Sequence, residues 1–384
     1  MPNRTRRRAA RALAMAMFVA ISVRLRTGGN YVHATGVAND GTETSSESSR
    51  MGAKTFGMLA KEMKDKVEDQ CRLLETNATA LEEILDIAWK SELTPWLEGM
   101  KHNFTMIVHK NDAKGPFQAG NGPPGSHIGQ IVGQLAGTIR DLTAAATESA
   151  LDSKINAFDI RVNYGWATFT MASMGAEVYS FEPMQSNIRF LRTALCLSPP
   201  EMRSRVTLFD FGLSDKNQEC MILSVDNNIG DGQVVCHEDK EKASATGQYA
   251  SQFGTEKKFR ENVRLQRLDD VLLKDEDAEI ILPKVDIVKM DTEGHEPFLV
   301  EGGKRFFRKF KPRVVHSEFD NRIMTSVHAD SKGMMSFFVE ELGYTVRENR
   351  ATHFKRLGRG PLSKVVAMDM TNFNGLHDLI FEHE

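Results

Sequence analysis

Short apolar runs that alternate with helical segments are the feature of this sequence that most constrains its fold. The runs occur at 158–162, 177–181, 205–209, 285–290 and 313–318, and helical patterns separate most of them. Alternation at this spacing is typical of βαβ units, in which parallel strands are joined by right-handed helical crossovers. The pattern therefore predicts an α/β domain with a mostly parallel sheet and helices on both faces.

Four further segments complete the predicted strands. Residues 344–347 and 365–370 are interpreted as a closing antiparallel pair, and 220–225 and 263–268 as extra strands of an insertion. The insertion surrounds a polar loop rich in Lys, Glu, Gly and Ser. This loop either forms a lid over a site or is a disordered surface loop, and the sequence leaves both readings open.

The first 50 residues are predicted to be a targeting segment and a linker. Five arginines within the first eleven residues precede an apolar run at 12–23, which is shorter than the roughly 20 residues of a membrane span. This arrangement is typical of a secretory signal or a signal anchor, and an acid-poor, Arg-rich segment also fits an organelle transit peptide. We expect the secretory pathway or secretion, with an organelle as the alternative and with membrane attachment through this segment as one option.

Residues 51–150 are predicted to be a helical region that precedes the main domain at 151–384. Between 55 and 89, apolar residues recur at helical spacing, for example Met63 and Val67, and a second amphipathic helix carries Leu135 and Ile139 on one face. We expect the first helix to pack on the main domain, although a stem or a self-associating helix would show the same pattern. The sequence does not settle the oligomeric state.

Composition excludes some classes of function. The formal net charge of −3 argues against a nucleic-acid binder, which would carry a basic excess. The four cysteines form no C-x-x-C pair, so a zinc site is not expected. Cys220 and Cys236 would be able to pair in an oxidising compartment.

The stretch 285–296, VDIVKMDTEGHE, joins a buried strand to a cluster of acids. The apolar run ends just before Asp291 and Glu293, and Gly294 permits a sharp turn. Ligands of open α/β sheets bind beyond the carboxyl ends of the strands. We therefore expect a functional site here, with a solvated, helix-capping acid cluster as the alternative.

Polar residues at the first two strands favour an adenosine-containing ligand. Asp159, Asn163 and Gly165 accompany the first strand, and Glu182 closes the second. An acid at this second position commonly binds both ribose hydroxyls. Pyrophosphate binding needs several glycines, and only Gly165 is present. S-adenosylmethionine, which has no phosphate, therefore fits better than NAD, and Asp291 would accept from its cationic groups.

These segments resemble the FkbM family of S-adenosylmethionine-dependent methyltransferases. The matching pieces stand in family order over 155–344, and they are DIRVNYG (159–165), YSFEP (179–183), FGLSD (211–215), RLDDV (267–271), DIVKMDTEGHE (286–296) and PRVVHSE (312–318). The resemblance implies a class I methyltransferase (Rossmann-like) fold with about seven strands. It also implies transfer of a methyl group to a hydroxyl of a small-molecule or glycan acceptor. Asp159, Asn163, Gly165 and Glu182 would line the cofactor site.

One position departs from the family pattern D-x-G-A-N-x-G. Arg161 and Val162 stand where Gly-Ala is usual, and glycine there lets the backbone come close to a ligand. Arg161 either blocks the cofactor or binds its methionine carboxylate through the guanidinium fork. The alternative to an active enzyme is therefore a catalytically degenerate binding protein with a methyltransferase fold.

Methyl transfer to a hydroxyl depends on in-line positioning and benefits from a general base. We expect Glu293, Asp291 and His295 to be the catalytic residues. His316 and Glu318, at the end of the next strand, are further candidates for the base.

Asp320 and Asn321 raise the question of a metal. Together with Asp291 they resemble the magnesium-binding arrangement of catechol-type O-methyltransferases, and oxygen ligands of this kind suit a hard cation. The FkbM resemblance implies no metal, and we expect none.

Overall fold

The structure is a computed structural model of the chain. It describes residues 55–112, 127–149, 154–236, 257–273, 282–348, 373 and 375–383. The predicted targeting segment and linker, the polar loop of the insertion and the predicted strand at 365–370 lie outside these residues. The described residues all belong to one compact unit, Ala53–Glu384. Among the described residues, none of the helices combines the length and the apolar character needed to cross a membrane.

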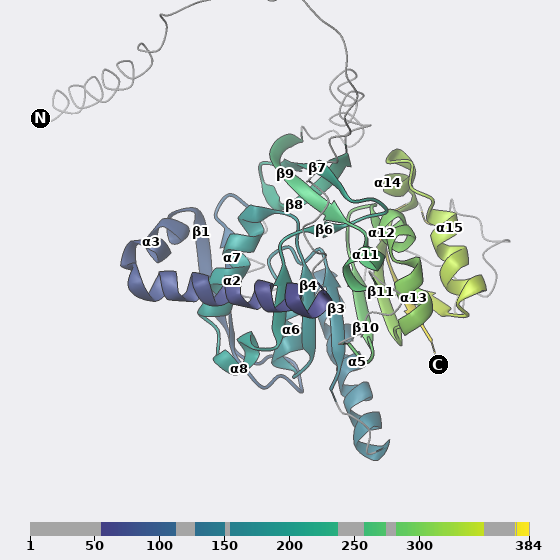
Figure 1. The fold of residues 1–384 in the computed structure, drawn as a ribbon, viewed down its shortest axis with the longest axis horizontal. Coiled ribbons are helices and arrows are strands. Elements are labelled where there is room, and N and C mark those ends of the chain that lie inside the picture. The colour runs from purple at the N-terminus through teal and green to yellow at the C-terminus, as the bar shows by residue number, and fades with distance from the viewer. Residues whose placement is uncertain are drawn as a thin grey trace, which may run out of the picture. The chain divides into compact units, whose positions relative to one another are not determined.

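A seven-stranded mixed sheet forms the centre of this unit (Figure 1), in the order β12-β13-β11-β10-β3-β4-β5. The strands from β11 to β5 are parallel, and β13 is antiparallel to both of its neighbours. The strands are β3 (Asn156–Ile160), β4 (Glu177–Phe181), β5 (Val206–Phe209), β10 (Ile287–Met290), β11 (Val314–Phe319), β12 (Thr345–Glu348) and β13 (His377–Glu382). The predicted α/β fold is confirmed. Among the described residues β12 pairs with β13, whereas the sequence analysis predicted its partner at 365–370.

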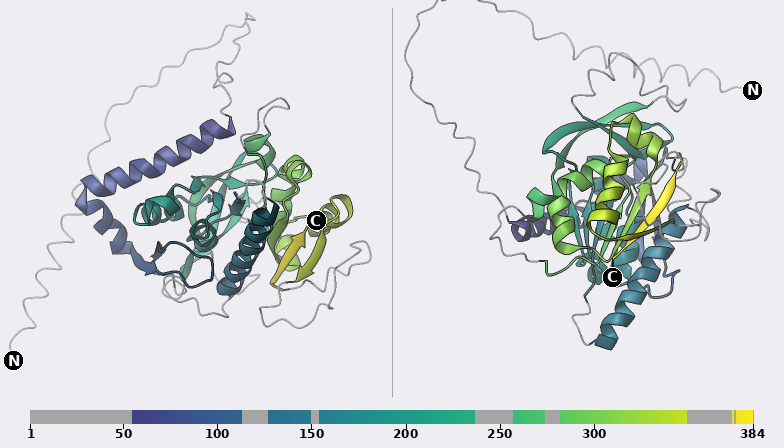
Figure 2. Two further views of the ribbon diagram at one scale, coloured as in Figure 1. Left: turned by 90° about the horizontal axis from the view of Figure 1, so that it is seen from below. Right: turned by 90° about the vertical axis from the view of Figure 1, so that its right-hand side faces the viewer.

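Helices cover both faces of the sheet because its central strands are apolar on both sides. One face packs against α5 (His127–Ser149), α6 (Trp166–Ser173) and α7 (Gln185–Cys196) through residues such as Ala157 and Ile287. The other face, with Phe158 and Val288, packs against a second set of helices (Figure 2). These are α11 (Leu268–Leu272), α12 (Glu296–Gly302), α13 (Lys304–Phe310), α14 (Asn321–Ser326) and α15 (Ser331–Ser336), which continues as the π-helical turn η2 (Phe337–Glu341).

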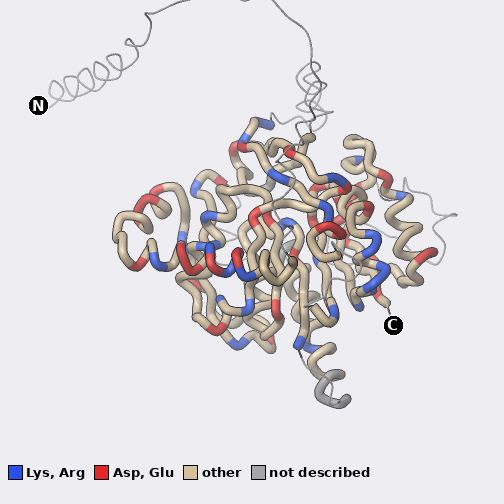
Figure 3. The backbone as a smooth tube through the Cα atoms, in the orientation of Figure 1, with Lys and Arg blue, Asp and Glu red and all other residues tan. Residues whose placement is uncertain are grey.

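The region before α5 contains two helices and a hairpin. The predicted helix at 55–89 is broken at Asn77, whose side chain caps the second helix by accepting from the Thr79 N–H. The elements are α2 (Phe56–Thr76), α3 (Ala78–Ile87), β1 (Ala88–Leu93) and β2 (Phe104–His109); a short helix, α8 (Pro200–Arg203), follows α7 later in the chain. Acidic and basic residues alternate along α2 (Figure 3).

Helix α2 covers β5, the outermost strand of the sheet. The ring of Phe56 stacks on that of Phe209 with 5.8 Å between centroids, and Lys66 donates to the Asp210 carboxylate just beyond β5 at 2.7 Å. An edge strand without such a cover presents unpaired backbone groups to other chains. The N-terminal helix therefore protects the sheet edge.

The insertion after β5 forms a separate four-stranded sheet in the order β6-β9-β7-β8. Its strands are β6 (Gly212–Leu213), β7 (Gln218–Val225), β8 (Asn228–Cys236) and β9 (Lys258–Gln266). Glu261 on β9 accepts hydrogen bonds from the backbone N–H groups of Gln185 and Ser186 at the start of α7. This contact fixes the insertion at the carboxyl edge of the main sheet.

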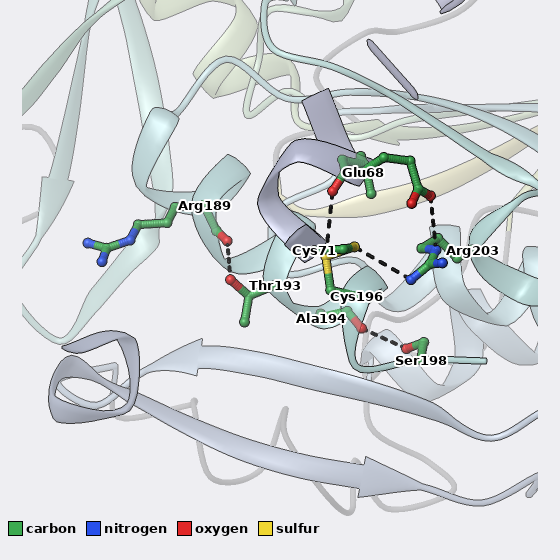
Figure 4. The surroundings of a disulfide bond; sticks show 9 residues. Glu68, Cys71, Arg189, Thr193, Ala194, Cys196, Ser198 and Arg203 are labelled. Carbon is green, nitrogen blue, oxygen red and sulfur yellow. Dashed lines mark hydrogen bonds and ion pairs between the residues drawn. A yellow bond between two sulfur atoms is a disulfide. The ribbon is translucent and has the colours of Figure 1, made fainter. Parts of the chain in front are cut away.

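Two disulfides connect the four cysteines. Cys71 of α2 is bonded to Cys196 of α7 across 125 residues, and Cys220 is bonded to Cys236 within the β7–β8 hairpin across 16 residues. Arg203 lies beside the first bond, donates to Cys71 Sγ at 3.5 Å and pairs with Glu68 at 3.2 Å (Figure 4). The Cys71–Cys196 bond thus ties the N-terminal helix to the helical layer of the main sheet.

We predict that the long-range disulfide stabilises the fold more than the hairpin disulfide. Closing a longer loop removes more entropy from the unfolded chain. The pair Cys71→Ala/Cys196→Ala should therefore lose about 1–2 kcal/mol more unfolding free energy than Cys220→Ala/Cys236→Ala. Urea denaturation of both double variants under oxidising conditions measures this difference, and an equal or reversed loss would contradict it.

Candidate functional site

The carboxyl ends of β3, β4, β10 and β11 bring most of the predicted site residues to one edge of the sheet. Asp159, Lys289 and His316 stand side by side on β3, β10 and β11 in the strand register. Asp291 and Glu318 follow two residues further along β10 and β11. Because side chains alternate between faces, these residues lie on the face that α5 and α6 cover.

Asp159 is fully buried and is engaged by the protein itself. Its Oδ2 accepts from the Thr168 hydroxyl on α6 at 2.6 Å, and its Oδ1 lies 3.4 Å from the Lys289 ammonium. The same Thr168 hydroxyl lies 2.7 Å from the Ser180 hydroxyl on β4. Asp159 thus connects helix α6, strand β3 and the buried lysine beneath the site.

The loop between β3 and α6 is built from left-handed backbone conformations. Arg161, Asn163 and Gly165 have φ values of 64°, 55° and 97°. A Cβ on Gly165 would lie 2.7 Å from the Phe169 ring and 2.9 Å from Leu191. A left-handed conformation costs a residue with a side chain roughly 1–2 kcal/mol, which gives a physical reason for the glycine that FkbM proteins usually have at position 161.

Glu182 closes β4 and is only 1% exposed. Its carboxylate accepts from the backbone N–H groups of Asn163 at 2.8 Å and Met184 at 3.0 Å, and from Asn187 Nδ2 at 3.3 Å. Burial raises the pKa of Glu182 to about 7, although these donors and the charge of Arg161 act in the opposite direction. The structure therefore places Asn163, Gly165 and Glu182 together at the predicted cofactor edge.

The Arg161 guanidinium is 8% exposed and points toward the acids at the end of β10. Its Nη1 donates to the Asp291 carbonyl at 3.3 Å and to Glu293 Oε1 at 3.4 Å, and it lies 3.7 Å from Asp291 Oδ1. Its Nη2 donates to the Gly232 carbonyl of β8 at 2.8 Å. The guanidinium thus fills the space between β8 and the acid cluster.

Lys289 is a functional candidate that the sequence reasoning missed. Its ammonium donates to the Arg161 carbonyl at 2.9 Å and pairs with Asp159 at 3.4 Å and Asp291 at 3.5 Å. Burial alone would lower the pKa of Lys289, but the two carboxylates outweigh burial and raise it. The sequence does carry a signal for this role, because Lys289 stands within the otherwise apolar run IVKM.

The carboxylates of Asp291, Glu293 and Glu318 form an acidic cluster in which one oxygen of each lies within 4.8 Å of the others. Arg161 and Lys289 supply positive charge to it. Asp320 and Asn321, considered above with a metal, have other contacts: the Asp320 carboxylate binds Arg322, and Asn321 Oδ1 accepts from Ser331.

The two histidines have different surroundings. His295 is buried, its Nε2 lies 2.8 Å from the Ser214 hydroxyl, and its ring packs on Phe298. His316 faces a small cavity of about 10 Å³ that Asp291 and Glu318 also line, and its Nε2 has no hydrogen-bond partner among the described residues. Burial lowers the pKa of each to about 4, so both are neutral at pH 7. Asp291 and Glu293 thus lie together in the acidic cluster, whereas the contacts of His295 are with Ser214 and Phe298.

Strand β8 of the insertion lies against the cofactor loop. The Gly230 carbonyl accepts from Asn187 Nδ2 at 3.2 Å, and a Cβ on Gly230 would lie 2.5 Å from the Tyr164 ring. The Tyr164 hydroxyl donates to Asp112, which follows β2, at 3.2 Å, and burial raises the pKa of Tyr164. Strand β8, which the sequence reading did not predict, therefore packs beside the loop between β3 and α6, and the lid reading of the polar loop stays a prediction because most of that loop lies outside the described residues.

The strand order, with antiparallel β13 between β11 and β12, and the acids at the ends of β4 and β10 define a class I (Rossmann-like) methyltransferase domain. Residues 157–346 match the family model of the methyltransferase FkbM domain. This part of the chain is therefore an FkbM methyltransferase domain.

Solved structures of other methyltransferases are similar to parts of the chain. The glycopeptide N-methyltransferase MtfA is 24% identical over 19% of this chain and 33% of its own, with a TM-score of 0.16. The bacterial CtHen1 methyltransferase domain is 11% identical over 66% of this chain and 100% of its own, with a TM-score of 0.29. WbdD is 12% identical over 70% of this chain and 37% of its own, with a TM-score of 0.33. The chain thus spans about a third of MtfA, and a search of curated proteins found no match.

We predict that Glu182 makes the fold less stable as the pH rises from about 4.5 to about 7. In this range the unfolded chain releases the proton while the folded chain retains it, so the free energy of unfolding falls by on the order of 3 kcal/mol. Urea denaturation at several pH values should show a smaller fall for Glu182→Gln. Glu177→Gln, at the partly exposed start of the same strand, should show the same fall in unfolding free energy as the wild type. If Glu182→Gln also showed the wild-type fall, the raised pKa of Glu182 would be refuted.

Lys289→Met should destabilise the protein by about 3–5 kcal/mol, because removing one partner leaves the buried carboxylate of Asp159 uncompensated. Lys284→Met is a control on the same segment, since the Lys284 side chain is 41% exposed and pairs with Asp286 at 3.2 Å. A pair whose cation is partly solvated should lose clearly less than a fully buried one. Equal losses for the two variants in urea denaturation would rule out the proposed role of Lys289.

Proposed function

We propose that the protein transfers a methyl group from S-adenosylmethionine to a hydroxyl of a sugar or another small acceptor. The observation that carries this proposal is Glu182, which ends β4 beside the loop of Asn163 and Gly165 in an FkbM domain. A carboxylate at this place suits the two ribose hydroxyls of an adenosyl group. Asn163 Oδ1, which accepts no hydrogen bond among the described residues, offers a further acceptor.

The charge of the site also favours this cofactor. Four carboxylates at the edge face two buried cations, so the edge carries a formal excess of negative charge. The groups are Asp159, Asp291, Glu293, Glu318, Arg161 and Lys289. A sulfonium with an adjacent ammonium is attracted by such an edge, and the attraction is stronger in a partly buried site than in water.

The chain's residues would act mainly by positioning. An acceptor oxygen placed in line with the sulfonium bonds to the methyl carbon while the carbon–sulfur bond breaks, and the electron pair stays on sulfur. The hydroxyl proton would pass to a carboxylate of the acidic cluster. Glu293 is the better placed base, because its left-handed backbone conformation (φ 55°) and partial exposure put it at the rim, and Asp291 is the second.

The proposed compartment is the secretory pathway. Both disulfides join cysteines in the described fold, and such bonds form and persist in oxidising compartments. The basic, apolar N-terminal segment is in keeping with this location. A glycan or other small secreted molecule would then be the acceptor, and nucleic acid is not expected as a partner.

A degenerate binding protein is the second candidate, and Arg161 favours it. The guanidinium occupies the region beside Asp291 and Glu293, where the cationic part of the cofactor would bind. A protein of this kind would bind no S-adenosylmethionine, or would bind it without turnover. Incubation with the cofactor and a panel of sugars, followed by detection of S-adenosylhomocysteine, separates the two candidates.

Calorimetric titration with S-adenosylmethionine tests the proposal directly. We expect binding to the wild-type protein, and Glu182→Ala should weaken it by about 100-fold or more, because two hydrogen bonds to a charged acceptor are lost. Glu177→Ala, at the amino end of the same strand, should bind like the wild type. Absence of binding to the folded wild-type protein would refute the proposed function.

A further inference from the structure

We infer that Arg161, together with Asp291 and Glu293, forms a recognition site for a zwitterionic α-amino-acid head group. This inference rests on the proposed function, and it names the part of the cofactor that Arg161 selects. The guanidinium would bind the carboxylate of the methionine moiety, while the acids and the Asp291 carbonyl would bind its ammonium. A residue that departs from the usual family glycine thereby becomes a specificity-determining residue.

The contacts between Arg161 and the acids are long. One nitrogen, Nη1, is shared among three acceptors at 3.3 to 3.7 Å, at the outer limit of hydrogen-bond geometry. The exposed pair between Arg347 and Glu382 shows the contrast in geometry, with two contacts at 2.9 and 3.0 Å. Because a buried charge is costly to leave without a partner, Arg161 and the acids would separate only for a ligand that supplies both charges.

The remainder of Arg161 is held firmly in place. Its N–H donates to the Phe181 carbonyl at 2.8 Å, its carbonyl accepts from Lys289 at 2.9 Å, and Nη2 donates to Gly232 at 2.8 Å. The backbone and one edge of the guanidinium are thus fixed, and the Nη1 edge faces the acids. Such a pre-positioned fork loses little conformational freedom when it binds a carboxylate.

An amino-acid head group matches this pair charge for charge. Its ammonium has three donors for the Asp291 carbonyl and the two carboxylates, and its carboxylate can receive two parallel N–H bonds from the guanidinium. On insertion each protein charge exchanges its partner for one of the same sign. The buried guanidinium and the partly buried acids therefore stay compensated, which avoids the large cost of leaving a buried charge unpaired.

The inference predicts a selectivity among cofactor analogues. S-adenosylhomocysteine has both head-group charges, its decarboxylated form keeps only the ammonium, and methylthioadenosine has neither. Methylthioadenosine still presents its ribose hydroxyls to Glu182, so it reports on the adenosine part of the site alone. Only ligands with the carboxylate should gain from Arg161.

The experiment is calorimetric titration of these three ligands into the wild-type protein, Arg161→Met and Arg161→Lys. In the wild type, S-adenosylhomocysteine should bind about 10- to 100-fold more tightly than its decarboxylated form. Arg161→Met should remove this preference and leave the affinity for methylthioadenosine unchanged, and Arg161→Lys should restore part of it. Arg205→Met is the control, because Arg205 pairs with Glu177 at the amino end of β4.

The outcomes separate this inference from the proposed function. If the wild type binds none of the three ligands, the proposed function itself fails. If it binds S-adenosylhomocysteine no more tightly than the decarboxylated form, or if Arg161→Met tightens S-adenosylhomocysteine, the head-group site is refuted while the proposed function stands. Thermal unfolding of each variant verifies folding, and the wild-type ligand comparison decides the question even if Arg161→Met does not fold.

Discussion

The buried ammonium of Lys289 is the interaction on which the arrangement of the site depends. It lies between Asp159 and Asp291 and binds the Arg161 carbonyl, so it joins the ends of β3 and β10 and the loop that follows β3. Without a cation at this place, two carboxylates at the end of neighbouring strands would repel each other inside the protein. The compensated acids in turn position Arg161, and Arg161 connects the sheet to strand β8 through Gly232.

Much of the fold was predictable because its signals are local. The apolar strands of the sheet appeared close to their predicted positions, and the α/β prediction is confirmed by the observed sheet. Strand β13 was missed because the partner of β12 was predicted at 365–370, which lies outside the described residues. The break at Asn77 was missed because apolar spacing continues across it, although Asn is a residue favoured at the N-cap of a helix.

The location of the site could be predicted from the sequence, but many contacts of its residues could not. Glu182, Asn163 and Gly165 could be grouped because they follow neighbouring strands, and the structure brings them together. The Ser214 partner of His295 and the carbonyl of Gly232 beside Arg161 come from the insertion, far away in the sequence. Contacts of this kind depend on how the second sheet docks, and no periodicity within one segment encodes them.

The position of α2 has a consequence for where the functional unit begins. The family match starts at residue 157, yet the helix that covers β5 and carries Cys71 lies before it, at Phe56–Thr76. Asp112, which holds Tyr164 beside the cofactor loop, also precedes the match. A fragment cut at the start of the match would expose a bare strand edge and leave Cys196 with a free thiol. The folded unit around the FkbM match therefore includes the described segment that begins at residue 55.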